Sequence, residues 1–173
     1  TPFQYSIHYQ ETKGGKIYHH EFLAKEGTDP REKLAQGLVD NIPKASCVLA
    51  YNCGFEKGVI EELAEQFPQH KGKLMDIHGS ILDLMTPFQS RAIYKKEMNG
   101  SYSIKAVLPA LVPEMSYDEM EISQGGQASS FYATLHLIER HEERKKIRHD
   151  LMEYCKLDTL AMVKILEIIE STD

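Results

Sequence analysis

The sequence predicts an α/β protein in which helices cover a mixed β-sheet, and two patterns support this prediction. Segments rich in aromatic and β-branched residues stand near the N-terminus, and short apolar runs alternate with amphipathic helical segments after them. Paired strands followed by strand–helix alternation indicate a sheet with antiparallel and parallel neighbours. Of the 173 residues, 42% are hydrophobic and 27% are charged, which is enough for one domain, residues 1–173, with a substantial core.

The first segments predict a β-hairpin followed by a helix. Residues 3–10 (FQYSIHYQ) and 16–24 (KIYHHEFLA) have the composition of strands, and Gly14 and Gly15 between them favour a turn. Residues 28–42 then place a proline in the first turn and apolar side chains at helical spacing. We therefore expect an antiparallel strand pair with a helix after it.

Two short apolar runs predict strands buried in a sheet. They are residues 45–52 (ASCVLAYN) and 80–85 (SILDLM), and each is of the length and composition found in sheet interiors. The first run leads directly into a helix predicted at 54–67. Functional groups in such folds collect where strands end.

The second half of the chain predicts loops and a helical C-terminal region. Residues 89–105 are basic, aromatic and contain glycine, and residues 106–115 are punctuated by proline. Residues 122–130 (ISQGGQASS) predict a loop that leads into a helix. From about 131–169 the pattern is helical, with an expected break near 139–143, where the apolar repeat lapses.

Composition excludes several classes of protein. No segment approaches the roughly 20 apolar residues of a membrane-spanning helix, and the first residues lack the layout of a signal peptide. Three widely spaced cysteines predict neither a disulfide framework nor a zinc site. We therefore expect a cytoplasmic protein without a membrane partner. A formal charge of −6 argues only weakly against nucleic-acid binding, because an enzyme that grips a few nucleotides needs only a local basic groove.

Asp158 falls on the apolar stripe of the last predicted helix. At about 100° per residue, seven apolar or aromatic residues lie within about 60° of it: Ile147, Leu151, Tyr154, Ala161, Met162, Ile165 and Ile169. An ionised carboxylate on a core-facing stripe is costly unless a cation or hydrogen bonds compensate. A lysine or arginine at the core edge would be one such partner, and a metal ion would be another. Tyr154 alone is consistent with a core aromatic residue.

Glu56 presents a similar pattern in the first turn of the helix predicted at 54–67. It shares a face with Ile60, Leu63, Ala64 and Phe67, and Asn52 is placed to cap the helix. An acid in a first turn is also favoured by the helix dipole alone. If both carboxylates point inward, Glu56 and Asp158 are able to converge on a divalent cation such as Mg²⁺ or Mn²⁺.

These two segments resemble motifs of the DnaQ-like 3′–5′ exonuclease superfamily, which has a ribonuclease H-like fold and four acidic ligands (DEDD). Residues 52–56 (NCGFE) are similar to its Asn-x-x-Phe-Asp motif, with Glu56 in the aspartate position. Tyr154 and Asp158 match the Tyr-x-x-x-Asp motif of the tyrosine-type branch. The order of elements is similar over nearly the whole chain, and it looks closest to a bacterial branch classed as a domain of unknown function.

The resemblance implies a two-metal nuclease that acts on single-stranded DNA or RNA with Mg²⁺ or Mn²⁺. Asp158 would be a direct metal ligand, Glu56 would support the second metal, and Tyr154 would orient the attacking water. Substrate contacts are expected from Asn52, Phe55, Asp83, Tyr102 and Lys105. Tyr102 and Lys105 belong to a basic and aromatic patch that consists of Arg91, Tyr94, Lys95, Lys96, Tyr102 and Lys105. This patch offers phosphate contacts and a stacking surface for bases; the alternative is that it is a solvated loop.

The first motif of the superfamily, Asp-x-Glu on the opening strand, has no match here. The resemblance places it before Thr1, so we expect a ribonuclease H-like sheet that lacks its first strand. Residues 1–173 are then expected to bind Mg²⁺ or Mn²⁺ weakly and to show little or no nuclease activity. The alternative is a catalytically inactive ribonuclease H-like module that binds nucleic acid or another partner.

Overall fold

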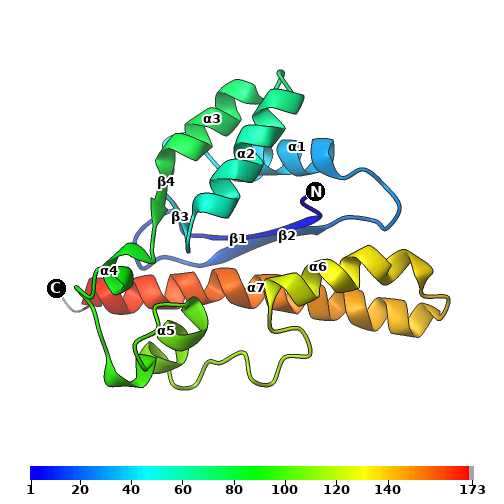
Figure 1. Ribbon diagram of the computed structural model, residues 1–173. Coiled ribbons are helices and arrows are strands. Elements are labelled where there is room, and N and C mark those ends of the chain that lie inside the picture. Colours follow the sequence, from blue (N-terminus) through cyan, green and yellow to red (C-terminus); the bar gives the residue numbers. More distant parts are fainter. Residues whose placement is uncertain (172–173) are drawn as a thin grey trace.

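The computed structural model describes residues 1–171 and holds two small sheets between two groups of helices (Figure 1). β1 (Gln4–Tyr9) and β2 (Tyr18–Leu23) form the antiparallel hairpin. β3 (Val48–Ala50) and β4 (Ile81–Asp83) form a parallel pair. The predicted α/β class with antiparallel and parallel strands is therefore confirmed.

The helices form a layer on each side of the hairpin (Figure 1). On one side lie α1 (Arg31–Asn41), α2 (Gly54–Gln66) and α3 (Lys71–Ser80). The other side holds α4 (Thr86–Gln89), α5 (Ile104–Leu111), α6 (Gly125–Thr134) and α7 (His141–Ser171), with short 3₁₀ turns at Lys96–Met98 and Leu135–Leu137. Within residues 1–171, no helix has both the length and the apolar character that crossing a membrane requires.

Alternation along β1 explains how the hairpin joins the two layers. Tyr5 and Ile7 point to the helices α1 to α3 and pack on their core. Ser6 and His8 point to the opposite face, where both contact the hydroxyl of Thr159 on α7 at 2.7 Å. Successive side chains of a strand alternate between faces, so the hairpin is covered on both sides.

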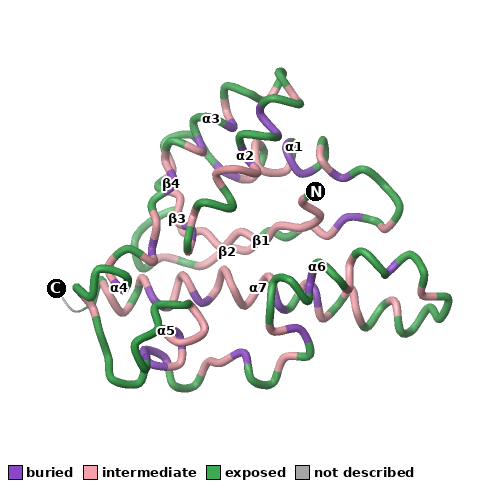
Figure 2. Tube along the Cα trace, in the orientation of Figure 1, coloured by how far each residue is buried: buried purple, intermediate pink, exposed green. Residues whose placement is uncertain are grey.

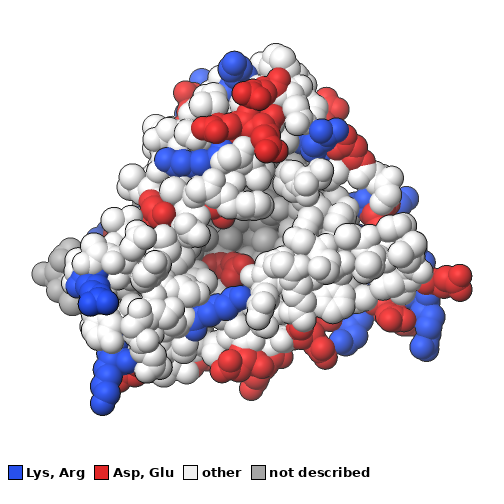
Figure 3. All heavy atoms as spheres, in the orientation of Figure 1, with Lys and Arg blue, Asp and Glu red and all other residues white. Residues whose placement is uncertain are grey.

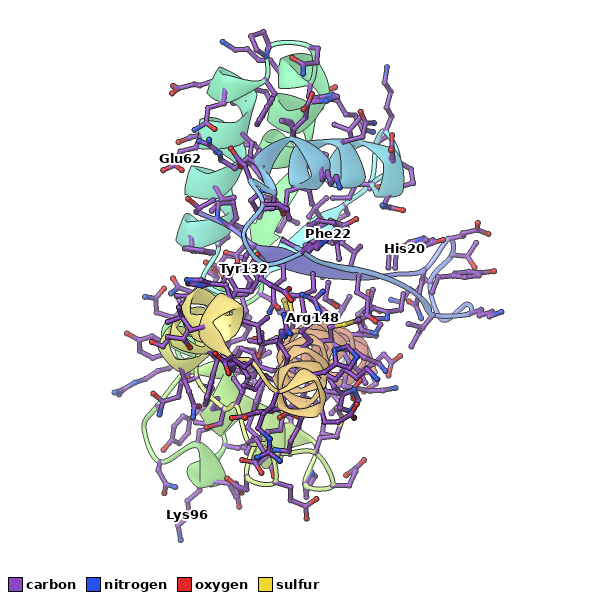
Figure 4. The ribbon with its side chains drawn as sticks, turned by 90° about the vertical axis from the view of Figure 1, so that its right-hand side faces the viewer. His20, Phe22, Glu62, Lys96, Tyr132 and Arg148 are labelled. Carbon is purple, nitrogen blue, oxygen red and sulfur yellow. The ribbon has the colours of Figure 1, made fainter. Side chains whose placement is uncertain are left out.

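Arg148 anchors the end of the hairpin to α7. Its guanidinium donates hydrogen bonds to the carbonyls of Leu23 and Ala24 and to the carboxylate of Glu26. Figure 4 shows Phe22 on the hairpin with Arg148 below it, between the two helical layers.

The apolar core has two parts, one in each layer (Figure 2). Leu34, Leu63 and Leu74 belong to the first part, beside β3 and β4. Leu151 and Ile165 of α7, both 0% exposed, belong to the second part. The organisation of residues 1–173 as one domain stays a prediction.

Helix α3 and the start of α6 differ from the sequence prediction, whereas the break before α7 agrees with it. Helix α3 was not expected, because only Leu74 and Ile77 repeat at helical spacing in it. The predicted loop at 122–130 is wrong in part, since α6 already begins at Gly125; glycine is tolerated in a first turn. The break before α7 is confirmed, and it lies at 138–140.

Candidate functional site

A groove of about 2410 Å³ runs between the hairpin and the parallel sheet. Every residue of β1 and β3 lines it, whereas β2 and β4 contribute only His20 and Ile81. Within residues 1–171, neither β1 nor β3 has a second strand neighbour. The unpaired edges of these two strands therefore face the groove. Figure 3 shows the hollow, with acidic atoms at its floor and a basic side chain beside it.

Asp158 lies in this groove, on the buried stripe of α7 that the sequence predicted. Leu151 and Ala161 on the same stripe are both 0% exposed. The Tyr117 hydroxyl donates a hydrogen bond of 2.7 Å to Oδ1 of Asp158. Burial raises the pKa of Asp158, and hydrogen bonds from Tyr117 and Tyr154 with the charge of Lys105 offset this only in part.

Tyr154 stands one helical turn before Asp158, and hydrogen bonding between the two side chains contributes to the pKa of both. The residue is only 8% exposed. Burial raises the pKa of Tyr154, and the charge of Asp158 raises it further. The phenol therefore stays protonated at neutral pH and is available as a hydrogen-bond donor.

Glu56 lies in the first turn of α2 and lines the same groove. Ile60 and Leu63 on the same helix face are buried, but the first turn extends past the core and Glu56 is exposed rather than buried in the core. Partial desolvation still raises the pKa of Glu56; a backbone hydrogen bond lowers it, and the charges of Asp83 and Asp158 raise it again. Glu56 is therefore within electrostatic range of both other carboxylates.

Asp83 is engaged by the backbone. Its Oδ1 accepts hydrogen bonds from the N–H groups of Asn52 and Met85 at 2.9 Å, and its Oδ2 accepts one from Cys53 at 3.1 Å. Burial alone would raise the pKa of Asp83, but these three donors outweigh it and hold the pKa below its ordinary value. The carboxylate thereby ties the end of β4 to the turn between β3 and α2.

Asn52 does not cap α2 with its side chain, which corrects the prediction. The residue before the helix is Cys53, and no side chain caps the helix there. Asn52 instead adopts a left-handed backbone conformation, with φ 61°. Asparagine tolerates this conformation better than most residues, so it allows the sharp turn that points its N–H at Asp83.

Two aromatic residues and one lysine border the groove near these acids. Phe55 is 74% exposed and Tyr102 is 44% exposed, and both line the groove. The Nζ of Lys105 lies 5.7 Å from the ring centre of Tyr117 and 5.9 Å from that of Tyr154. The rest of the predicted basic patch does not line the groove: Arg91, Tyr94, Lys95 and Lys96.

Sequence reasoning did not find Tyr117. It lies in the irregular segment 112–124, and its partner Asp158 is 41 residues away in the sequence. Nothing in a local pattern reports such a contact. Within residues 1–171, no group of three or more His, Cys, Asp or Glu side chains is arranged to hold a metal ion.

Comparison with known proteins identifies the family. Residues 1–103 match a family described as a domain of unknown function, DUF2779. No curated protein and no solved structure matches the chain. The matched residues include all four strands, Glu56 and Asp83, and they end before Tyr117, Tyr154 and Asp158. Because the match covers more than half of the 173 residues, the chain belongs to the DUF2779 family.

Proposed function

We propose that this chain forms part of a metal-dependent 3′–5′ exonuclease that hydrolyses phosphodiester bonds of single-stranded DNA or RNA. The observation that carries the proposal is the placement of Asp158 in a groove, under two tyrosine hydroxyls and in the electrostatic range of Glu56. A desolvated carboxylate is costly to keep, and an acid whose pKa is perturbed by burial in a cleft is a candidate for a functional site.

The donor set suits Mg²⁺ or Mn²⁺, because these cations prefer carboxylate oxygens. Neither Glu56 nor Asp158 forms a salt bridge with another residue of the described part of the chain. Asp158 would hold the ion directly and Glu56 would support a second one. A bound divalent ion would stabilise charge on the phosphate and lower the pKa of water.

The neighbouring side chains supply the other roles. Tyr154 would orient the attacking water through its protonated hydroxyl. The exposed rings of Phe55 and Tyr102 offer stacking surfaces for unpaired bases, and Lys105 offers a phosphate contact. Asp83 would act indirectly, because it holds the turn that carries Glu56 and Phe55.

The groove supports a ribonuclease H-like sheet as the finer description of the fold. Backbone N–H and C=O groups at a strand edge need partners, and here two such edges face one another between two helical layers. A strand in the groove, about 4.8 Å from each neighbour, would join β1 and β3 and make one five-stranded sheet. This is where we place the strand with the Asp-x-Glu motif that the sequence resemblance predicts.

The test is cleavage by the full-length parent protein that the resemblance implies, on 5′-labelled single-stranded DNA and RNA with Mn²⁺. We expect shortening from the 3′ end that is lost in Asp158→Asn and strongly reduced in Glu56→Gln. The matched control is Glu153→Gln, an exposed acid on the same helix. Cleavage by Asp158→Asn at the wild-type rate would overturn the proposal. Residues 1–173 alone are expected to show little or no activity.

A catalytically inactive module that binds nucleic acid is the second candidate. The observation that favours it is the lack, within residues 1–171, of any three His, Cys, Asp or Glu side chains arranged to hold a metal ion. This candidate predicts that the full-length parent binds single-stranded oligonucleotides equally well with Mn²⁺ and with a chelator, and cleaves neither. Metal-dependent cleavage excludes it.

A further inference from the structure

Tyr117 contacts the proposed site from outside every motif that the sequence revealed. It lies between α5 and α6, beyond the family match, yet it is only 5% exposed and packs in the core beside α7. Its hydroxyl donates a hydrogen bond of 2.7 Å to the Asp158 carboxylate. An irregular segment is thus fixed to a carboxylate on a different element.

The Asp158 carboxylate is held from two sides. Tyr154 reaches it along α7, from one turn earlier, whereas Tyr117 reaches it from the segment packed against that helix. The two rings lie 6.3 Å apart, at an angle of 60°. One donor on the same helix leaves an aspartate side chain free to change rotamer, and a second donor from another element removes this freedom.

The ring of Tyr117 has a separate contact. Lys105 Nζ lies within 6 Å of the ring centres of both Tyr117 and Tyr154, a distance at which cation–π attraction operates. The positive charge of Lys105 in turn lowers the pKa of Asp158. The hydroxyl of Tyr117 therefore contacts Asp158 while its ring faces Lys105.

We infer that Tyr117 is a positioning residue of this site: its hydroxyl fixes the orientation of Asp158, and its ring, with that of Tyr154, holds Lys105 beside the carboxylate. The inference deepens the proposed function and rests on it for the use of Asp158 as a metal ligand. The orientation of Asp158 itself can be measured without metal or substrate.

The test compares Tyr117→Phe, which keeps the ring and removes the hydroxyl, with Tyr94→Phe, an exposed tyrosine that does not line the groove. Crystal structures without metal should show Asp158 in a different or divided rotamer in Tyr117→Phe only. Mn²⁺ affinity of residues 1–173, measured by electron paramagnetic resonance, should fall about tenfold in Tyr117→Phe, or about 1.4 kcal/mol. Wild-type affinity in Tyr94→Phe is expected.

An unchanged single rotamer of Asp158 in Tyr117→Phe would overturn the inference, whatever the metal affinity. If wild-type protein binds no Mn²⁺ while Asp158 still reorients in Tyr117→Phe, the proposed function fails and the positioning role of Tyr117 stands. The two results are therefore distinguishable.

Discussion

Replacing Asp83 by asparagine tests how the turn that carries Glu56 is held. In the wild type, one carboxylate accepts hydrogen bonds from three backbone N–H groups, those of Asn52, Cys53 and Met85. Asparagine keeps one acceptor oxygen and places an NH₂ group where the other oxygen was. If its oxygen takes the Oδ1 position, the Cys53 N–H faces a donor and loses its partner.

The expected cost follows from these bonds. Hydrogen bonds to a charged acceptor contribute roughly 1.5–3 kcal/mol and those to a neutral acceptor about 1 kcal/mol. In Asp83→Asn the bonds from Asn52 and Met85 change from the first kind to the second, and the bond from Cys53 is lost. Because the carboxylate is only half-buried, we expect the free energy of unfolding to fall by about 3 kcal/mol. The melting temperature should fall by roughly 6–12 °C for a chain of this size.

Urea denaturation at pH 7 measures this difference, with Asp76→Asn as the control because Asp76 is an exposed acid on α3. The difference should also depend on pH. The folded-state pKa of Asp83 is depressed, so its stabilisation is present above the unfolded pKa of about 3.9 and is lost as the pH falls through the folded value. A loss below about 1 kcal/mol at pH 7, or a difference that does not shrink in acid, would refute the reasoning.

Three further predictions concern stability. Asp158→Asn should raise the free energy of unfolding of the metal-free protein by about 1 kcal/mol at pH 7 in thermal melts, because the folded pKa of Asp158 is raised and its ionisation at pH 7 is unfavourable. This gain in stability should vanish below the unfolded pKa of aspartate, where the side chain is protonated in both states. A lower free energy of unfolding in Asp158→Asn at pH 7 would contradict the prediction. Leu151→Ala, at a site 0% exposed, should lower the free energy of unfolding by about 3 kcal/mol in urea, and a loss under about 1 kcal/mol would show a looser core. Arg148→Met should speed hydrogen exchange of the backbone amides in the hairpin and leave exchange in α3 unchanged, because it removes the hydrogen bonds to the carbonyls of Leu23 and Ala24. Equal increases in exchange across the hairpin and α3 would argue against a local anchor.

Sequence patterns located the elements that repeat a signal over many residues. α7 spans 31 residues, so the buried stripe around Asp158 was evident from helical spacing alone. The strands were also predictable, because their short apolar runs have few alternatives in an α/β chain. Helix α3 offers only two buried apolar side chains, too few for its pattern to stand out.

The same reasoning located the candidate site only in part, because helical phase gives a direction and not the extent of the core. Glu56 shares a face with buried residues, yet the first turn of α2 lies beyond them and the side chain reaches the groove. The Tyr117 contact depends on how segment 112–124 folds back on α7, which no local pattern encodes. The three bonds to Asp83 likewise require a turn conformation at Asn52 that only tertiary structure reveals.

The central claim is that Asp158, with Glu56, binds a divalent cation, and Mn²⁺-dependent stabilisation of residues 1–173 tests it most directly. Binding with a Kd of about 1 mM would add about 1.4 kcal/mol at 10 mM Mn²⁺ and raise the melting temperature by roughly 3–6 °C. We predict this rise in the wild type and in Glu153→Gln, and none in Asp158→Asn. An equal rise in Asp158→Asn, or no rise in any of the three proteins, would contradict the claim.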